Sequence, residues 1–95
     1  MKLPSRFDMT ITHADFRRLL PAAVNHVPFT EKDSAFAYGD GARGWRISLS
    51  PLPQLQIGLI RLERHQVDFK FTGYSVDEIE KFMTRFEVYF RRGGG

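Results

Sequence analysis

The C-terminal run from Ser75 to Arg92 constrains the fold more than any other part of the chain, because it has the pattern of one strongly amphipathic helix. Its apolar residues recur at intervals of three and four and fall within an arc of about 140° on a helical wheel. They are Val76, Ile79, Phe82, Met83, Phe86, Tyr89 and Phe90, and only Val88 lies outside the arc. Such a helix is stabilised mainly by packing its apolar face. The rest of the chain must therefore offer an apolar surface for it to cover.

Both ends of this helix carry sequence signals. Ser75 and Glu78 have the S-x-x-E spacing of a capping box, in which each side chain accepts a hydrogen bond from the backbone N–H of the other residue. Arg91 and Arg92 place positive charge at the negative end of the helix dipole, and Gly93 follows as a left-handed cap. These signals predict where the helix begins and ends.

The length and composition predict a single folded domain, residues 1–95, in which we expect residues 1–5 and 93–95 to be flexible. A hydrophobic content of 42% is that of an ordinary globular protein. The absence of cysteine excludes disulfide bonds, thiolate nucleophiles and sulfur-ligated zinc. The chain has no apolar run of the kind found in a secretory signal or a membrane span. We therefore expect a cytoplasmic location and no membrane partner.

The net charge is mildly positive. There are 14 lysine and arginine residues against 11 aspartate and glutamate residues, which gives +3 with neutral histidines. Most of the basic residues are arginine, whose guanidinium suits bidentate contacts with carboxylate or phosphate. This balance permits binding to a polyanion but does not by itself indicate it.

The N-terminal third predicts a strand followed by a helix. Apolar and polar residues alternate over residues 6–12, as in a half-buried strand. The spacing then becomes helical over residues 12–27. Pro21 interrupts this pattern, so we expect the helix to kink before it or to restart after it. Residues 29–33 are interpreted as a loop.

Four further strands are predicted to form a meander. They cover residues 34–38, 44–50, 55–63 and 67–72. The glycine-rich residues 39–44 are interpreted as a hairpin turn, because a phosphate-binding loop would open a helix rather than a strand. Residues 51–54, which contain two prolines, and residues 64–66 are predicted to turn the chain again.

The third of these strands changes phase. Its first apolar residues, Leu55, Ile57 and Leu59, are spaced two apart and are interpreted as facing the interior of the fold. The apolar residues that follow, Ile60 and Leu62, have even numbers and would face the opposite side of a regular strand. Two interpretations remain open. Either a bulge near residues 58–60 exchanges the faces, or the strand stays regular and its last two apolar residues form a spot on the outer face.

These elements predict an α+β fold, a two-layer sandwich in the order β-α-β-β-β-β-α. The inward residues make one apolar sheet face: Phe7, Met9, Ile11, Trp45, Ile47, Leu49, Leu55, Ile57, Leu59, Val67, Phe69 and Phe71. Each helix has one apolar stripe, so both must lie on that face of a five-stranded antiparallel sheet. The first strand is expected to close the sheet antiparallel beside the last. This order of elements resembles one half of a TATA-box-binding-protein-like saddle, in topology only, which carries no function across.

No constellation of catalytic or metal-binding residues is evident. His13, His26 and His65 lack the spacings of a helical or strand metal site. No serine occupies the setting of a nucleophile elbow. We therefore expect no enzyme activity, no metal and no cofactor.

The outer sheet face is the predicted interaction surface. Gly58, Ile60 and Leu62 would form a small apolar centre there, with Phe36 and Tyr38 on the short second strand. An apolar spot rimmed by charge suits a symmetric dimer or a protein partner. The working hypothesis is a small non-catalytic cytosolic module that self-associates or docks on another protein.

Two alternatives remain. A nucleic-acid-binding module would use Arg6, Arg46 and Lys70 on the outer face together with Arg91 and Arg92. Few aromatic residues accompany these cations and acidic residues interrupt them, so a solvated mixed-charge face is favoured. The second alternative is a small-ligand pocket between the helices and the sheet. The terminal glycines are interpreted as a helix cap, since the diglycine tail of ubiquitin-like proteins follows a strand.

Overall fold

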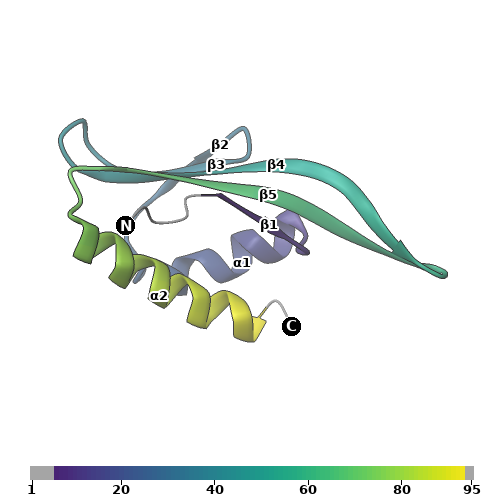
Figure 1. The fold of residues 1–95 in the computed structure, drawn as a ribbon. Helices are drawn as coiled ribbons and strands as arrows, with labels where there is room; N and C mark the ends of the chain where they lie inside the picture. The colour runs from purple at the N-terminus through teal and green to yellow at the C-terminus, as the bar shows by residue number, and fades with distance from the viewer. Residues whose placement is uncertain (1–5, 94–95) are drawn as a thin grey trace.

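The computed structural model describes residues 6–93, with side chains as far as Arg91. Its elements are β1 (Arg6–Met9), α1 (His13–Ala23), β2 (Thr30–Lys32), β3 (Ala35–Gly39), β4 (Gly44–Ile57), β5 (Ile60–Thr72) and α2 (Val76–Gly93). The five strands form one antiparallel sheet in the order β1-β5-β4-β3-β2, and both helices lie beneath one face of it (Figure 1). The predicted fold class and element order are confirmed. Gly93 belongs to α2, and the other residues expected to be flexible, 1–5 and 94–95, lie outside the described residues.

The sheet is built around one long hairpin rather than a series of short strands. β4 and β5 have 14 and 13 residues and are joined by Gly58 and Leu59. Gly58 has a φ of 60°, the positive value that a type II′ turn needs at its first central position. The predicted strands 44–50, 55–63 and 67–72 were therefore divided wrongly. The chain does not turn at residues 51–54 or at residues 64–66.

The prolines of β4 are tolerated because of the direction in which the backbone points. The N–H of Leu49 donates to the backbone oxygen of Ser34, 2.9 Å away, and therefore points away from β5. Pro51 is two residues further along and has the same orientation, so its missing N–H removes no bond to β5. Around Pro53 the register is irregular, with Leu52 opposite Arg64 and Leu55 opposite Leu62. This irregularity takes the place of the predicted turn.

Several helices and strands begin or end at other residues than predicted. β1 ends at Met9 rather than at residue 12, and β2 forms where a loop was expected, as an exposed edge strand beside β3. Thr12, the first residue of the predicted helical pattern, caps α1, since its hydroxyl accepts a hydrogen bond from the backbone N–H of Asp15. Pro21 lies in the last turn of α1, which ends at Ala23 instead of reaching residue 27.

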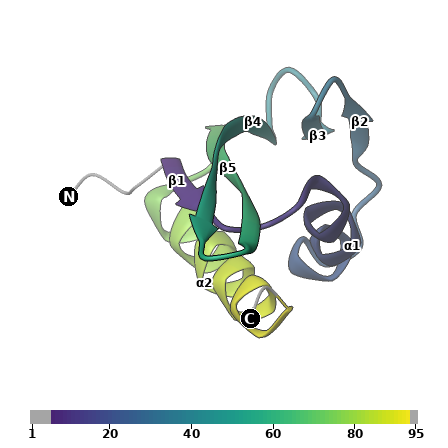
Figure 2. The same ribbon diagram turned by 90° about the vertical axis from the view of Figure 1, so that its right-hand side faces the viewer.

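The core fills the space between the sheet and the two helices, which lie side by side (Figure 2). Its aromatic centre is formed by Phe16 of α1, Phe69 of β5, and Phe86 and Phe90 of α2. The ring centroids of Phe86 and Phe90 are 4.0 Å apart, and Phe86 meets Phe69 edge-on at 4.9 Å. Such pairs add to the stability gained by burying the rings. The predicted docking of α2 on the sheet is therefore observed.

Arg85 joins the two helices by a contact that the helical pattern did not predict. Its guanidinium donates from Nε and Nη2 to the backbone oxygen of Ala22, at 3.2 and 3.0 Å. That oxygen lies in the last turn of α1, where carbonyl groups lack partners within the helix. The guanidinium also lies over the ring of Tyr89, 4.9 Å from its centre.

The predicted capping box at the start of α2 is present. The Ser75 N–H donates to Glu78 Oε1 at 3.0 Å, and the Glu78 N–H donates to Ser75 Oγ at 3.2 Å. Arg43, in the β3–β4 turn, donates to the other carboxylate oxygen of Glu78 and to the backbone oxygen of Gly73. The side chain of Glu78 therefore links the helix start to a turn that is distant in sequence.

This arrangement predicts a pH dependence of stability. The hydrogen bonds from Arg43 and from the Ser75 backbone lower the pKa of Glu78 from 4.5 to about 2. A carboxyl with a lowered folded-state pKa stabilises the protein above its unfolded pKa, and this contribution is lost as pH falls from about 4.5 to about 2. Glu78→Gln keeps a capping side chain without the charge. We expect the variant to lose less stability than the wild type over that pH interval in urea unfolding, and equal losses would contradict the assignment.

Candidate functional site

The distal part of the β4–β5 hairpin projects beyond the rest of the fold (Figure 1). The last pair between β3 and β4 joins Ala35 to Ser48, and the last pair between β1 and β5 joins Met9 to His65. Residues 50–64, called the arm below, therefore have no third strand beside them within the described part of the chain. The radius of gyration is 13.8 Å, whereas a compact chain of this length has about 12 Å. The arm accounts for this elongated shape.

One face of the arm is apolar. Leu55 lies opposite Leu62, and Ile57 lies opposite Ile60, and directly paired residues share a face of the ribbon. Between Leu52 and Leu55 the ribbon uses one more residue in β4 than in β5, so the odd-numbered residues of β4 change face. The resulting set, called the arm stripe below, is Leu52, Leu55, Ile57, Ile60 and Leu62.

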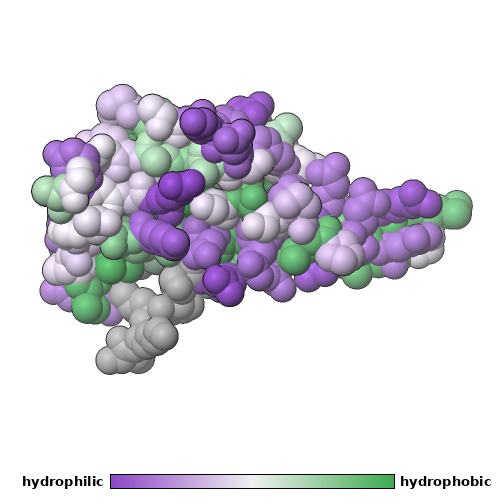
Figure 3. Space-filling view, turned by 90° about the horizontal axis from the view of Figure 1, so that it is seen from above, coloured by the Kyte–Doolittle hydropathy of each residue, from purple (hydrophilic) through white to green (hydrophobic). Residues whose placement is uncertain are grey.

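Most of the arm stripe is open to solvent, while Leu52 and Leu62 are half-buried. Leu55 is 41% exposed and both isoleucines are 59% exposed, while Leu59 at the tip is fully exposed. Figure 3 shows the arm as a narrow extension with apolar atoms along it and at its end, bordered by hydrophilic residues. Large apolar side chains that gather in this way, outside the core, are typical of interaction surfaces.

The placement of three predicted core residues was wrong. Leu55, Ile57 and Leu59 were assigned to the inner face, but the long hairpin carries them past the helices that would cover them. Ile60 and Leu62, both predicted interface residues, follow the alternation of β5 and share the outer sheet face with Asp68 and Lys70. The irregularity lies in β4, not near residues 58–60, and Gly58 is the turn residue.

The remaining two predicted interface residues lie on the other side of the sheet. Phe36 is opposite Ile47 and fully buried in the core, and Tyr38 packs beside Trp45 with 6.1 Å between ring centroids. In β3, apolar residues occupy both parities, so alternation alone could not decide which pair faced inward. Pairing with β4 decides it, and leaves the small Ala35 and Ala37 outside.

The five predicted polyanion contacts do not gather in one place. Arg46 and Lys70 are directly opposite each other on the outer face. Arg6 is paired with Asp68 at 3.2 Å, and Arg91 is paired with Glu87 at 3.5 Å at the far end of α2. The side chain of Arg92 lies outside the described part of the chain. Two neighbouring cations make a small basic spot rather than a groove that could follow a nucleic-acid backbone.

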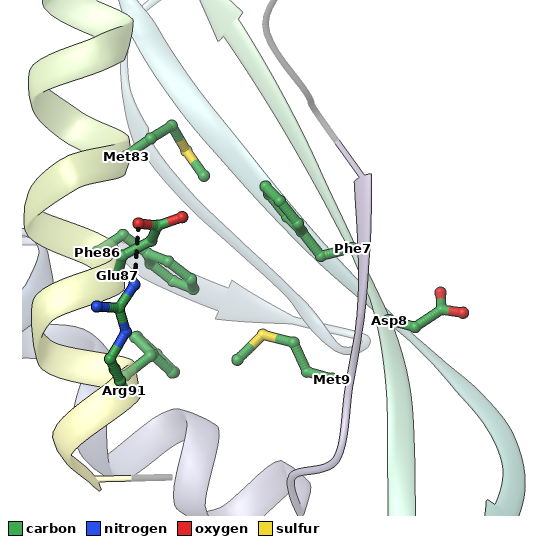
Figure 4. Close-up of a pocket in the computed structure, with 8 residues that line it drawn as sticks. Phe7, Asp8, Met9, Met83, Phe86, Glu87 and Arg91 are labelled. Atoms are coloured by element: carbon green, nitrogen blue, oxygen red, sulfur yellow. Dashed lines mark ion pairs between the residues drawn. The ribbon is translucent and has the colours of Figure 1, made fainter. Parts of the chain in front are cut away.

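An apolar hollow lies between β1 and α2, with a volume of about 230 Å³. Phe7 and Met9 point into it from β1, and Met83 and Phe86 point into it from α2 (Figure 4). Asp8 points away from it. At the rim, the charge of Arg91 is neutralised by Glu87. Small-ligand sites combine an apolar lining with polar groups that orient the ligand, and this hollow supplies only the lining.

A cluster of polar groups near α1 was not predicted from the sequence. The rings of His13 and His65 lie 6.5 Å apart, and His65 Nδ1 is 2.8 Å from the backbone oxygen of Ile11. Arg17 donates both Nε and Nη2 to the Glu31 carboxylate, and these bonds lower the pKa of Glu31 below its ordinary value. Within residues 6–93, no three histidine, aspartate or glutamate side chains are arranged to hold a metal ion.

Neither helix of the described chain combines the length and the apolar character needed to cross a bilayer. Comparison with protein-family models, with curated proteins and with solved structures finds no match. The topological resemblance to half of a TATA-box-binding-protein-like saddle therefore rests on element order alone.

Proposed function

We propose that this protein is a small non-catalytic assembly module of the cytoplasm that self-associates through its hairpin arm. The observation that carries the proposal is the arm stripe, in which five leucine and isoleucine side chains share one face of a ribbon beyond the reach of either helix. These side chains contribute little to the core of the monomer. Contact between side chains of the arm stripe and a second copy would remove part of this apolar surface from water, which is the main driving force of association.

The shape of the arm supports the same proposal. A two-stranded ribbon alone in water is marginally stable, and further strands or a packed face are needed to hold it firmly. Among the residues that the structure describes, the arm has neither, since β1 and β3 both stop before it. A second copy would supply what is missing, and the arm would then be ordered by the same contacts that hold the dimer together.

The two alternatives have less support. A nucleic-acid-binding face would depend on Arg46 and Lys70, because Arg6 and Arg91 are held in ion pairs. That alternative predicts affinity for single-stranded oligonucleotides that falls steeply with added salt. The small-ligand alternative would depend on the apolar hollow beside β1, and it predicts a co-purifying molecule of a few hundred daltons in native mass spectra.

The proposal is tested with Ile60→Lys and a matched control, Val88→Lys. Val88 is also an exposed apolar residue, but it lies on α2. Lysine within an apolar interface should cost about 2 kcal/mol per copy, so Ile60→Lys should raise the dimer Kd by about a thousandfold. Native mass spectrometry should show dimers for the wild type and the control and monomers for Ile60→Lys. A wild type that stays monomeric at about 100 μM would contradict the proposal.

A further inference from the structure

One edge of the arm is open for strand pairing. β1 covers β5 only as far as His65, so residues 60–64 have no neighbour on that side among residues 6–93. Unpaired N–H and C=O groups along such an edge form a template for another strand. The opposite edge, along β4, carries Pro51 and Pro53, which lack the N–H that a pairing strand would need. Only the β5 edge of the arm is therefore suited to accept a partner strand.

We propose that two copies of the chain join by antiparallel pairing of their β5 edges about a twofold axis at Leu62. The inference rests on the proposed self-association and names the contact that produces it. Antiparallel pairing of a strand with its own copy is symmetric about one residue. Each contact between two different residues therefore occurs twice, once on each side of the axis. The result would be a continuous four-stranded arm, in the order β4, β5, and then β5 and β4 of the second copy.

The length of the open edge favours this axis. The edge begins at Ile60, directly after the turn, and ends at Arg64, directly before the residue that pairs with β1. Leu62 is its middle residue. Pairing centred there places Ile60 opposite Arg64 of the second copy and uses the whole edge without displacing β1. A centre nearer to either end would leave part of the edge unpaired or would collide with β1.

The backbone orientation is also compatible. The N–H of Leu49 donates to Ser34 and therefore points away from β5. Leu49 and Val67 are directly opposite each other but are not hydrogen-bonded to each other, so the backbone groups of Val67 point away from β4. The direction alternates along a strand, so Arg61 and Glu63 share the orientation of Val67. Their backbone N–H and C=O groups therefore face the open edge. Pairing about Leu62 sets these two residues opposite each other, as a hydrogen-bonded pair requires.

The charges select the same register. Arg61 and Glu63 are both exposed, and neither takes part in an ion pair within residues 6–93. With the axis at Leu62, Arg61 of each copy lies opposite Glu63 of the other, which gives two complementary pairs. An axis at Arg61 would oppose two arginines, and an axis at Glu63 would oppose two glutamates. Opposite charges stabilise a cross-strand pair, whereas like charges destabilise it.

The other face of the ribbon carries the arm stripe. Leu62 would meet Leu62 of the second copy, and each is already paired with Leu55 of its own chain. Four leucines would then form one row across the four strands. In the neighbouring row, the aliphatic stem of Arg64 would cover Ile60 of the second copy. The pairing therefore joins complementary charges on one face and apolar side chains on the other.

The test uses the charge reversals Arg61→Glu and Glu63→Arg in the full chain. Each variant alone places like charges opposite each other at both pairs, and its dimer Kd should rise by at least about tenfold. When the two variants are mixed, each glutamate of one chain faces an arginine of the other. A 1:1 heterodimer should therefore form with an affinity close to that of the wild type. The double variant, which exchanges both charges within one chain, should dimerise as the wild type does.

Native mass spectrometry distinguishes these species by mass, and circular dichroism shows that each variant is folded. A dimeric wild type whose affinity is unchanged by either single reversal would overturn the Leu62 axis but leave the proposed self-association intact. Weakened homodimers that fail to form a heterodimer on mixing would overturn the axis as well. A monomeric wild type would overturn both proposals.

Discussion

Phe86→Ala should lower the free energy of unfolding by about 3 to 5 kcal/mol, which is a large part of the stability of a domain of this size. Phe86 is 3% exposed and lies where the two helices and the sheet meet. Its ring contacts Phe90 at 4.0 Å, Phe69 at 4.9 Å and Phe16 at 6.1 Å between centroids. Truncation removes the buried ring and leaves a cavity among aromatic side chains, which cannot easily collapse.

Urea unfolding followed by circular dichroism measures this loss. Val88→Ala is the matched control, because Val88 lies on the same helix but is 43% exposed. We expect the control to change the free energy of unfolding by less than about 0.5 kcal/mol. A Phe86→Ala midpoint equal to that of the wild type would show that α2 is not docked on the sheet in solution.

Gly73→Ala should have the second large effect, a loss of about 3 kcal/mol or more. Gly73 connects β5 to α2 with a φ of 73°, a conformation that costs alanine about 1 to 2 kcal/mol. A Cβ at this position would also lie within van der Waals overlap of the backbone oxygen of Ala42. That oxygen belongs to the β3–β4 turn, which Arg43 ties to Gly73 itself by a hydrogen bond of 2.9 Å. The clash therefore cannot be relieved by rotating a side chain.

Substitutions at two other glycines separate the cost of the positive φ from the cost of the backbone collision. Gly58 has a φ of 60° but open space around it, so Gly58→Ala should show the conformational cost alone, about 1 to 2 kcal/mol. Gly41 has neither a positive φ nor a near neighbour, so Gly41→Ala should be close to neutral. The difference between Gly73→Ala and Gly58→Ala measures the backbone collision. Equal losses at the two positions would show that the turn yields to the extra methyl group.

These substitutions also separate the functions of two regions. Phe86 and Gly73 belong to the body of the fold, where a change should alter the free energy of unfolding. Ile60, Arg61 and Glu63 belong to the arm, where a change should alter association and leave the unfolding of the monomer nearly unchanged. A module that assembles through a projecting ribbon should show this independence, because its interface is not part of its core.

Local signals determined the helices. The apolar period of α2 and the exchange of hydrogen bonds between Ser75 and Glu78 depend on residues three and four apart, so they could be predicted before any tertiary contact was known. The cap at Thr12 is of the same kind. The fold class followed, since two helices with one apolar stripe each must cover one face of a sheet.

Strand pairing determined the rest. Leu55 and Ile57 alternate just as Ile47 and Leu49 do, and nothing within the strand shows that only the second pair lies beneath a helix. Pro51 indicates a turn until the orientation of its neighbour Leu49 shows that no bond to β5 is lost. The arm, and with it the place of Leu55 and Ile57 in the arm stripe, could therefore not be predicted from local pattern, whereas Ile60 and Leu62 were predicted as interface residues.

By itself, the amino-acid sequence determined the element types, the N-terminal helix caps, the antiparallel two-layer class and the apolar character of Ile60 and Leu62, whereas Gly93, expected as a cap, belongs to α2. The tertiary structure alone decided that β4 and β5 form one hairpin, that Phe36 faces the core, and that Arg61 and Glu63 lie on an open edge. The physical reason is the range of the interactions involved. A helix is specified within four residues, whereas the partner of a strand is chosen by the combined fit of side chains and backbone groups that are distant in the chain.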